Sequence, residues 1–234
     1  MSKYNVILWD LDDTLLDFGY SQAYALSRCF CSIGRKLQPE ELTLYSKINR
    51  SYWERLERGE ITKEELIPGR FLTLFEQLGI EGVDVDKFRK KYQEALGSVF
   101  SFRDDALTIC QSLRGIVKQY VITNGVAHTQ LHKLRLSGLA ETMDGIFISD
   151  EIGYQKPDSK FFQYCLDHME EKDLSKILVV GDSLTSDMLG GIRMGIPTCW
   201  YNPSGTSNDS DIHPDMVIDD LHRIYDVLEV FGNA

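Results

Sequence analysis

The sequence predicts an α/β fold in which a mostly parallel β-sheet is interrupted, after its first strand, by a helical insertion. After about residue 100, short apolar strands alternate with helices, which is typical of βαβ units. Between about residues 20 and 100, apolar residues instead recur at intervals of three and four, with few strand signals. We therefore expect residues 1–17 and 101–234 to form the core, and residues 18–100 to form a helical cap.

The first strand is expected at residues 4–9, because the chain opens with the apolar run Tyr4–Trp9. Helices follow from two buried stripes and from their boundary signals. Pro39 suits the first turn of one helix. Thr62 and Glu65 form a capping box that opens the next, and Gly79 closes it. The stripes are Leu42, Tyr45, Ile48, Tyr52 and Leu56, and then Leu66, Phe71, Leu74, Phe75 and Leu78.

Five further strands are expected in the second half of the chain. They are short, apolar and rich in β-branched residues, as buried parallel strands usually are. Their ranges are Tyr120–Thr123, Gly145–Ser149, Ile177–Gly181, Pro197–Tyr201 and a weaker Met216–Ile218.

Composition excludes several classes of protein. The 234 residues are 43% hydrophobic and 26% charged, which indicates an ordinary globular protein, and the net charge of −11 disfavours binding to polymeric nucleic acid. The five cysteines form no CxxC pair, so neither a zinc site nor a disulfide framework is indicated. We see no export signal and no membrane-spanning run, so a cytoplasmic location is expected. No pattern indicates an oligomeric state.

Polar residues gather where four of these segments end. The segments are Asp10–Thr14, Thr123–Gly125, Lys156–Asp158 and Gly181–Ser183, with Asp187 following the last. In an open parallel sheet, ligands bind outside the carboxyl ends of the strands. These segments are therefore expected to meet in one crevice.

Such a set suits the hydrolysis of a phosphate monoester. A carboxylate such as Asp10 can attack phosphorus and form an acyl phosphate. Asp12, two residues along the same side of the chain, can protonate the leaving oxygen and then activate water. Mg²⁺ is typically held by one or two carboxylates, which Asp10 and Asp182 can supply.

The remaining polar groups can bind the phosphate itself. The Thr123 hydroxyl and the amides around Asn124 can hold phosphate oxygens, and Lys156 can balance negative charge. The less favoured alternative is that Lys156 is a surface lysine before a proline, as most lysines are exposed. The aromatic residues Tyr52, Trp53 and Phe71 are more often core residues than ligand contacts.

In this order, the four segments resemble the motifs of the haloacid dehalogenase superfamily. Asp10–Thr14 matches DxDx[TV], Thr123 the second motif, Lys156 the third, and Gly181–Asp187 the acidic GDxxxxD. The resemblance implies a Rossmann-like core with a C1-type helical cap. It implies that Asp10 is the nucleophile and Asp12 the general acid and base.

The resemblance also assigns ligands. Catalytic residues would be Asp10, Asp12, Thr123 and Lys156, and phosphate would contact Asp12, Thr123, Asn124, Gly125 and Lys156. Mg²⁺ would contact Asp10, the backbone carbonyl of Asp12 and Asp182, with Asp187 supporting the site.

A narrower resemblance is to the bacterial pyrimidine 5′-nucleotidase branch, which dephosphorylates nucleoside monophosphates. It is carried by residues 51–56, Ile122–Gly125, 190–195 and 197–202. The expected partner is thus a small phosphorylated metabolite. A phosphatase or phosphomutase acting on sugar phosphates remains an alternative. So does a phospho-accepting binding or signalling module without turnover.

Overall fold

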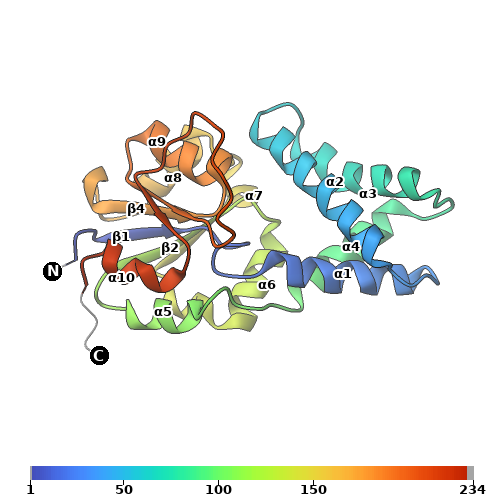
Figure 1. Ribbon diagram of the computed structural model, residues 1–234, viewed down its shortest axis with the longest axis horizontal. Coiled ribbons are helices and arrows are strands. Elements are labelled where there is room, and N and C mark those ends of the chain that lie inside the picture. Colours follow the sequence, from blue (N-terminus) through green and yellow to red (C-terminus); the bar gives the residue numbers. More distant parts are fainter. Residues whose placement is uncertain (1, 231–234) are drawn as a thin grey trace. The chain divides into compact units, whose positions relative to one another are not determined.

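A computed structural model describes residues 2–230 of the chain (Figure 1). The chain divides into two compact units. One consists of the residues up to Phe18 together with those from Phe100 onward, and we call it the core unit. The other, Gly19–Val99, we call the helical unit.

The core unit is built on a six-stranded sheet with the order β3-β2-β1-β4-β5-β6, and every neighbouring pair is parallel. This confirms the predicted parallel α/β fold, including the weak last strand. The order places β1 between β2 and β4. The strands are β1 Val6–Trp9, β2 Lys118–Thr123, β3 Gly145–Ile148, β4 Ile177–Gly181, β5 Thr198–Tyr201 and β6 Met216–Ile218.

Helices cover both faces of this sheet, which explains why the strands are apolar throughout. Alternate side chains of β1 enter two different cores: Val6 and Leu8 on one face, Ile7 and Trp9 on the other. Helices α8 (Ser159–Asp167) and α9 (Leu189–Met194) lie on one side, and α5 (Ala106–Ser112) and α10 (Ile224–Val227) on the other (Figure 1).

The remaining helices of the core unit are short, apart from α6. They are α6 Ala127–Ser137, α7 Ser149–Ile152, the one-turn π-helix Leu184–Met188, and the 3₁₀ turns Leu139–Thr142, Leu174–Lys176 and Leu221–Arg223.

The helical unit contains α2 (Pro39–Glu57), α3 (Lys63–Leu78), α4 (Val85–Gly97) and nearly all of α1 (Phe18–Ser32). The predicted start and end signals of its helices are confirmed. The Thr62 amide donates to Glu65 Oε2 at 2.8 Å, and the Glu65 amide donates to Thr62 Oγ1 at 3.3 Å. Pro39 is in the first turn of α2, and Gly79 ends α3 in the left-handed conformation.

The interior of the helical unit is aromatic. Phe71 is fully buried, and its ring centroid lies 5.5 Å from that of Tyr45, 5.3 Å from Phe88 and 5.1 Å from Tyr92. Stacked and edge-on pairs at this spacing stabilise helix packing. Phe71 is therefore a core residue, as its position on the stripe predicted.

Within residues 2–230, no helix combines the length and the apolar character that crossing a lipid bilayer requires.

Candidate active site

The candidate site lies at the carboxyl ends of β1, β2 and β4. Asp10 directly follows β1, Thr123 ends β2, and Asp182 directly follows β4. Trp9, the last residue of β1, is in register with Val121 and Val180, so β2 extends two residues and β4 one residue further at this edge of the sheet. Along the chain, β2 and β3 are added on one side of β1, and β4, β5 and β6 are then added on its other side. Such a reversal of strand order is the usual position of a ligand site in a parallel sheet.

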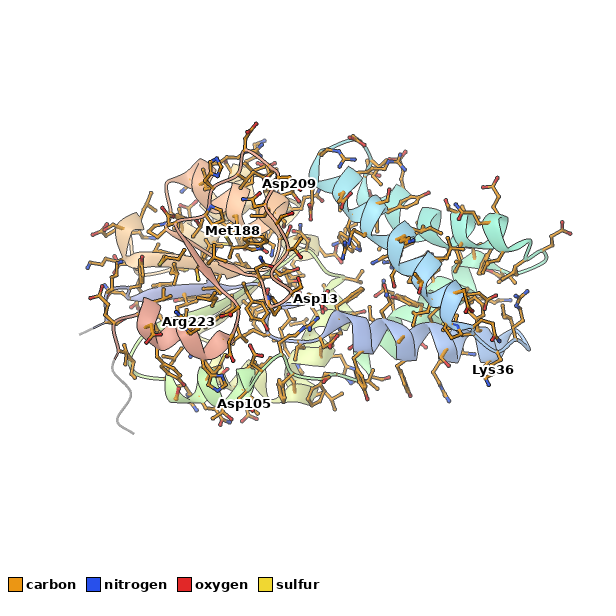
Figure 2. All side chains as sticks on the ribbon, viewed as in Figure 1. Asp13, Lys36, Asp105, Met188, Asp209 and Arg223 are labelled. Carbon is orange, nitrogen blue, oxygen red and sulfur yellow. The ribbon has the colours of Figure 1, made fainter. Side chains whose placement is uncertain are left out.

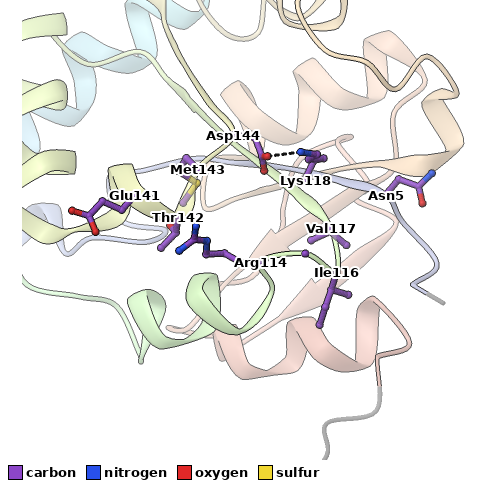
Figure 3. A pocket seen from close by; sticks show the side chains of 10 residues that line it. Asn5, Arg114, Ile116, Val117, Lys118, Glu141, Thr142, Met143 and Asp144 are labelled. Carbon is purple, nitrogen blue, oxygen red and sulfur yellow. Dashed lines mark hydrogen bonds and ion pairs between the residues drawn. The ribbon is translucent and has the colours of Figure 1, made fainter.

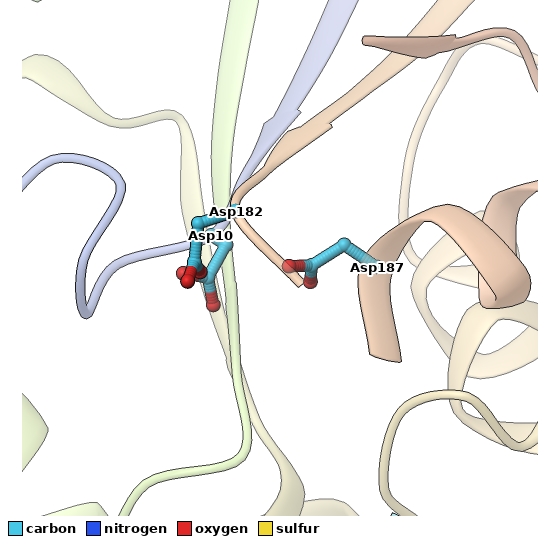
Figure 4. Close-up of side chains that lie close together, drawn as sticks. All are labelled: Asp10, Asp182 and Asp187. Carbon is cyan, nitrogen blue, oxygen red and sulfur yellow. The ribbon is translucent and has the colours of Figure 1, made fainter. Parts of the chain in front are cut away.

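Three buried or half-buried acids form the centre of the site (Figure 4). Asp10, Asp182 and Asp187 each offer a carboxylate oxygen, and these oxygens lie within 4.8 Å of one another. Asp187 belongs to the one-turn π-helix that follows β4, and its Oδ2 accepts a hydrogen bond from the Ser183 amide at 3.2 Å. The structure thus brings Asp10 next to two acids that lie more than 170 positions later in the sequence.

Lys156 is buried within this acidic cluster. Its Nζ donates to Asp10 Oδ1 at 2.7 Å, to Asp187 Oδ1 at 2.6 Å and to the Ile122 carbonyl at 2.9 Å. Only 1% of the residue is exposed, so Lys156 is not a surface lysine. All three ammonium hydrogens have acceptors, which fixes the position of the charge.

An asparagine clamps the backbone of this lysine. The Asn124 side chain donates from Nδ2 to the Lys156 carbonyl, and its Oδ1 accepts from the Lys156 amide, both at 2.9 Å. The side-chain amide of Asn124 is therefore committed to placing Lys156. This contact joins the loop after β2 to the segment that carries Lys156.

Thr14 connects the two acids that end β1 and β4. Its hydroxyl donates to Asp10 Oδ2 at 3.0 Å and accepts from the Asp182 amide at 3.0 Å. Both oxygens of Asp10 are thus held, one by Thr14 and one by Lys156. Asp10 is fixed in one orientation, as a nucleophile in a confined site needs to be.

Asp12 points to a different set of partners. Its Oδ1 accepts from Lys133 Nζ at 2.7 Å, and its Oδ2 accepts from Gln130 Nε2 at 2.8 Å. Gln130 also donates to Thr123 Oγ1 at 2.8 Å. Sequence reasoning singled out neither Gln130 nor Lys133.

The chain reverses sharply after Asp12. Asp13, labelled in Figure 2, has a φ of 65°, a left-handed conformation that is uncommon for residues other than glycine. Its Oδ1 accepts from Arg103 Nη2 at 2.7 Å and from the Phe18 amide at 3.2 Å. These contacts hold the turn that aims the side chains of Asp10 and Asp12.

Burial shifts the pKa values of the central acids. Burial raises the pKa of Asp10 to about 7; the charge of Lys156 opposes the rise and that of Asp187 adds to it. Burial, and then the charges of Asp10 and Asp187, hold the pKa of Asp182 well above its ordinary range. Although its own burial acts in the opposite direction, the charges of Asp10 and Asp187 raise the pKa of Lys156.

These residues fit a divalent cation with oxygen ligands. When all are ionised, three carboxylates and one ammonium leave an excess of two negative charges in a nearly buried space. A doubly charged cation would balance that excess, and hard cations such as Mg²⁺ prefer carboxylate oxygens. Asp10 and Asp182 directly follow β1 and β4, whereas Asp187 lies further along the chain, on the one-turn π-helix.

A separate cavity of about 460 Å³ lies at the other end of the sheet (Figure 3). Its lining includes Asn5, Lys118 and Asp144, at or next to the amino ends of β1, β2 and β3. Lys118 and Asp144 form an ion pair of 2.8 Å there. None of the predicted site residues lines this cavity.

A family model described as haloacid dehalogenase-like hydrolase matches residues 4–195. The match covers the acidic cluster, Lys156 and the helical unit. It therefore extends over most of the chain.

The relatives that match nearly the whole chain include three bacterial proteins. The HAD-hydrolase YfnB of Bacillus subtilis is 34% identical over 230 residues, covering 98% of this chain and 97% of that protein. The pyrimidine 5′-nucleotidase YjjG of Escherichia coli is 31% identical, covering 97% and 98%. The pyrimidine 5′-nucleotidase PynA of Streptococcus pneumoniae is 32% identical, covering 97% and 95%.

The fold also matches a solved structure. The crystal structure of the orthorhombic form of YfnB, bound to magnesium, superposes with a TM-score of 0.93. It covers 97% of this chain and 100% of that one, at 34% identity.

Proposed function

The chain belongs to the haloacid dehalogenase-like hydrolase family, and from that premise we propose that it is a magnesium-dependent phosphatase of nucleoside 5′-monophosphates, with pyrimidine nucleotides preferred. Two relatives that match it along almost their whole length are named as pyrimidine 5′-nucleotidases. The observation that carries the proposal is the buried cluster of Asp10, Asp182 and Asp187 around Lys156. It combines a fixed carboxylate with a site for positive charge, as attack on a phosphate dianion requires.

Under this proposal, Asp10 is the nucleophile and Asp12 is the general acid and base. In the first step an Asp10 oxygen attacks phosphorus, the bond from phosphorus to the ester oxygen breaks, and Asp12 gives that oxygen a proton. In the second step water attacks the aspartyl phosphate and Asp12 takes a proton from it. The bond to Asp10 then breaks, and inorganic phosphate leaves.

The other residues bind the phosphate and the metal ion. Lys156 offsets negative charge on Asp10 and on the phosphoryl group. When bound, Mg²⁺ would add positive charge at the phosphoryl oxygens. The proposed phosphate contacts are Asp12, Thr123, Asn124, Gly125 and Lys156, and the proposed metal ligands are Asp10, the carbonyl of Asp12 and Asp182, with Asp187 in support.

Residues 18–100 are proposed to act as a cap that selects the group attached to the phosphate. The crystal structure of YfnB is described as revealing interdomain movement, which supports a moving cap in this family. Closure of such an element would exclude water from the phosphoryl group.

The substrate proposal is tested by turnover of a matched panel in magnesium buffer. Deoxyuridine, uridine and thymidine monophosphates are expected to exceed sugar phosphates in kcat/KM by at least about 10-fold, since discrimination is a ratio of these constants. Phosphate release without a bisphosphate activator separates a phosphatase from a phosphomutase. Higher values for the sugar phosphates would contradict the nucleotide preference but leave phosphatase chemistry intact.

Asp12→Asn is expected to slow turnover by roughly 10²–10⁴-fold, the usual effect of removing a general acid and base. The loss should be smaller for p-nitrophenyl phosphate than for an alkyl phosphate, because a good leaving group needs less protonation. Measuring kcat for both substrates checks this. Equal losses for the two would assign Asp12 a different role.

Magnesium is expected to stabilise the protein more at high pH than at low pH. Because the folded-state pKa of Asp10 is raised from 3.8 to about 7, stability without metal is greatest below the lower value and falls as pH rises through the upper one. Asp182 shifts in the same direction. A bound cation offsets this loss by balancing the ionised acids.

Melting temperatures in chelator and in magnesium, at about pH 5 and about pH 8, measure this difference. Asp182→Asn is the matched variant. It removes one acid, so magnesium should raise its melting temperature by less than it raises that of the wild type. An equal magnesium effect at both pH values would contradict the metal assignment.

A further inference from the structure

One face of α6 lies against Asp12 and Thr123, and the proposed mechanism does not yet use it. Gln130 and Lys133 occupy this face, and they are 1% and 0% exposed. Lys133 Nζ lies 2.7 Å from Asp12 Oδ1 and 5.4 Å from the centroid of the Phe18 ring. The Asp12 side chain itself remains 24% exposed. A fully buried lysine therefore holds a carboxylate that can still reach solvent.

Such a lysine is poorly explained by stability alone. Burying an ammonium group is energetically costly, and well-packed apolar residues often replace buried ion pairs with no loss of stability. An apolar side chain of similar length could pack at this position, because the Lys133 ammonium already lies 5.4 Å from the centroid of the Phe18 ring. What an apolar residue could not do is fix the orientation of Asp12.

Gln130 extends the same control to Thr123. Asp12 Oδ2 accepts a hydrogen bond from Gln130 Nε2, so the Gln130 amide directs its NH₂ group to this carboxyl oxygen. That group has two hydrogens, one for Asp12 Oδ2 and one for Thr123 Oγ1, each at 2.8 Å. The two proposed catalytic side chains are thus joined through a single amide.

This arrangement determines what the Thr123 hydroxyl can donate to. Its oxygen accepts from Gln130 and, at 3.1 Å, from the Gly125 amide. A hydroxyl oxygen has two acceptor lone pairs, so both are in use. The hydroxyl hydrogen must then point elsewhere, and within residues 2–230 the structure gives it no acceptor. It is available to a phosphate oxygen.

Gly125 makes room for this contact. A methyl group at that position would overlap the Cδ and Nε2 atoms of Gln130. Any larger residue at position 125 would displace the amide that links Asp12 to Thr123.

We propose that Lys133 and Gln130 are positioning residues of this site: Lys133 fixes the Asp12 carboxylate, and Gln130 couples it to the Thr123 hydroxyl. The inference rests on the proposed phosphatase function. Neither residue contacts the reacting atoms, so each acts through another side chain. Their removal should therefore affect the reaction only while Asp12 or Thr123 is present.

A double-mutant cycle tests this. Lys133→Met keeps the length of the side chain and is expected to lower kcat for an alkyl phosphate by roughly 10–100-fold, the usual effect of losing a supporting contact. The loss should be smaller for p-nitrophenyl phosphate, as for Asp12→Asn. In the Asp12→Asn background, Lys133→Met should cost less than about 2-fold, because it then has nothing to position. Lys133→Arg should restore part of the activity.

The matched control is Lys118→Met. Lys118 also pairs with an aspartate, Asp144, at 2.8 Å, but at the amino end of β2. Lys118→Met removes the same charge as Lys133→Met and is expected to leave kcat unchanged. Melting temperatures separate loss of function from loss of fold. If Lys133→Met does not fold, the cycle is run with Gln130→Met paired with Thr123→Val.

The outcomes separate the two proposals. Suppose that the wild-type protein is an active phosphatase, but that Lys133→Met lowers kcat by the same factor with and without Asp12→Asn. That result would overturn the positioning role and leave the phosphatase function intact. The same conclusion would follow if Lys133→Met alone had the kcat of the wild type. If the wild-type protein releases no phosphate from any monoester in magnesium, the proposed function fails, and the inference that rests on it fails too.

Discussion

Replacing Asp10 by asparagine is expected to abolish turnover, with a loss on the order of 10⁶-fold, the scale seen when a nucleophile is removed. The amide has nearly the same shape as the carboxylate, but it cannot attack phosphorus. Its carbonyl can still accept from Lys156 Nζ, and its NH₂ can face the Thr14 hydroxyl. The fold should therefore be kept.

Phosphate release over long incubations measures the loss, and intact-mass spectrometry excludes deamidation back to aspartate. The Asp12→Asn variant is the complementary control, because it retains the nucleophile and should still gain the mass of one phosphoryl group. In metal-free buffer, Asp10→Asn should not lower stability, since it removes one of three crowded acids. Activity above about 1% of wild type, with no aspartate at position 10, would remove Asp10 from the nucleophile's role.

The fold was predictable from local patterns, because each strand and helix carries its own signal. The run Tyr4–Trp9, the capping box at Thr62 and the apolar strands after residue 100 all depend on neighbours in the sequence. The strand ends at Asp10, Thr123 and Asp182 followed from the same patterns, since parallel strands end at one edge of a sheet.

The supporting contacts were not predictable in this way, because they join distant segments. The Asn124 clamp on Lys156 spans 32 positions, and the Lys133 pair with Asp12 spans 121. On α6 the buried positions include Thr129, Gln130 and Lys133, so a polar face is turned inward. From helical periodicity alone, a polar face is predicted to lie toward solvent. The signal that could have revealed the buried polar face is the position of α6, which begins directly after the Thr123–Gly125 segment.

The second large effect is expected for Lys156→Met. Lys156 holds Asp10, Asp187 and the Ile122 carbonyl, so its removal leaves three buried acceptors without this donor. Breaking a buried ion pair by removing one partner usually costs about 3–5 kcal/mol. We expect a loss of that size in the free energy of unfolding, in chelator at about pH 8. Turnover should fall by about 10²–10³-fold or more, because the positive charge beside the nucleophile is lost.

Denaturant unfolding and kcat for the same preparations measure both effects. The stability loss should be smaller at about pH 5, where the crowded acids of the variant hold protons, since raised folded-state pKa values favour the folded state at low pH. Magnesium should raise the stability of the variant more than that of the wild type, because it replaces part of the missing positive charge. Lys118→Met, at an exposed pair, should change neither quantity appreciably. A Lys156→Met protein that is as stable and as active as the wild type would show that Lys156 does not balance these acids, and the charge argument for the site would fail.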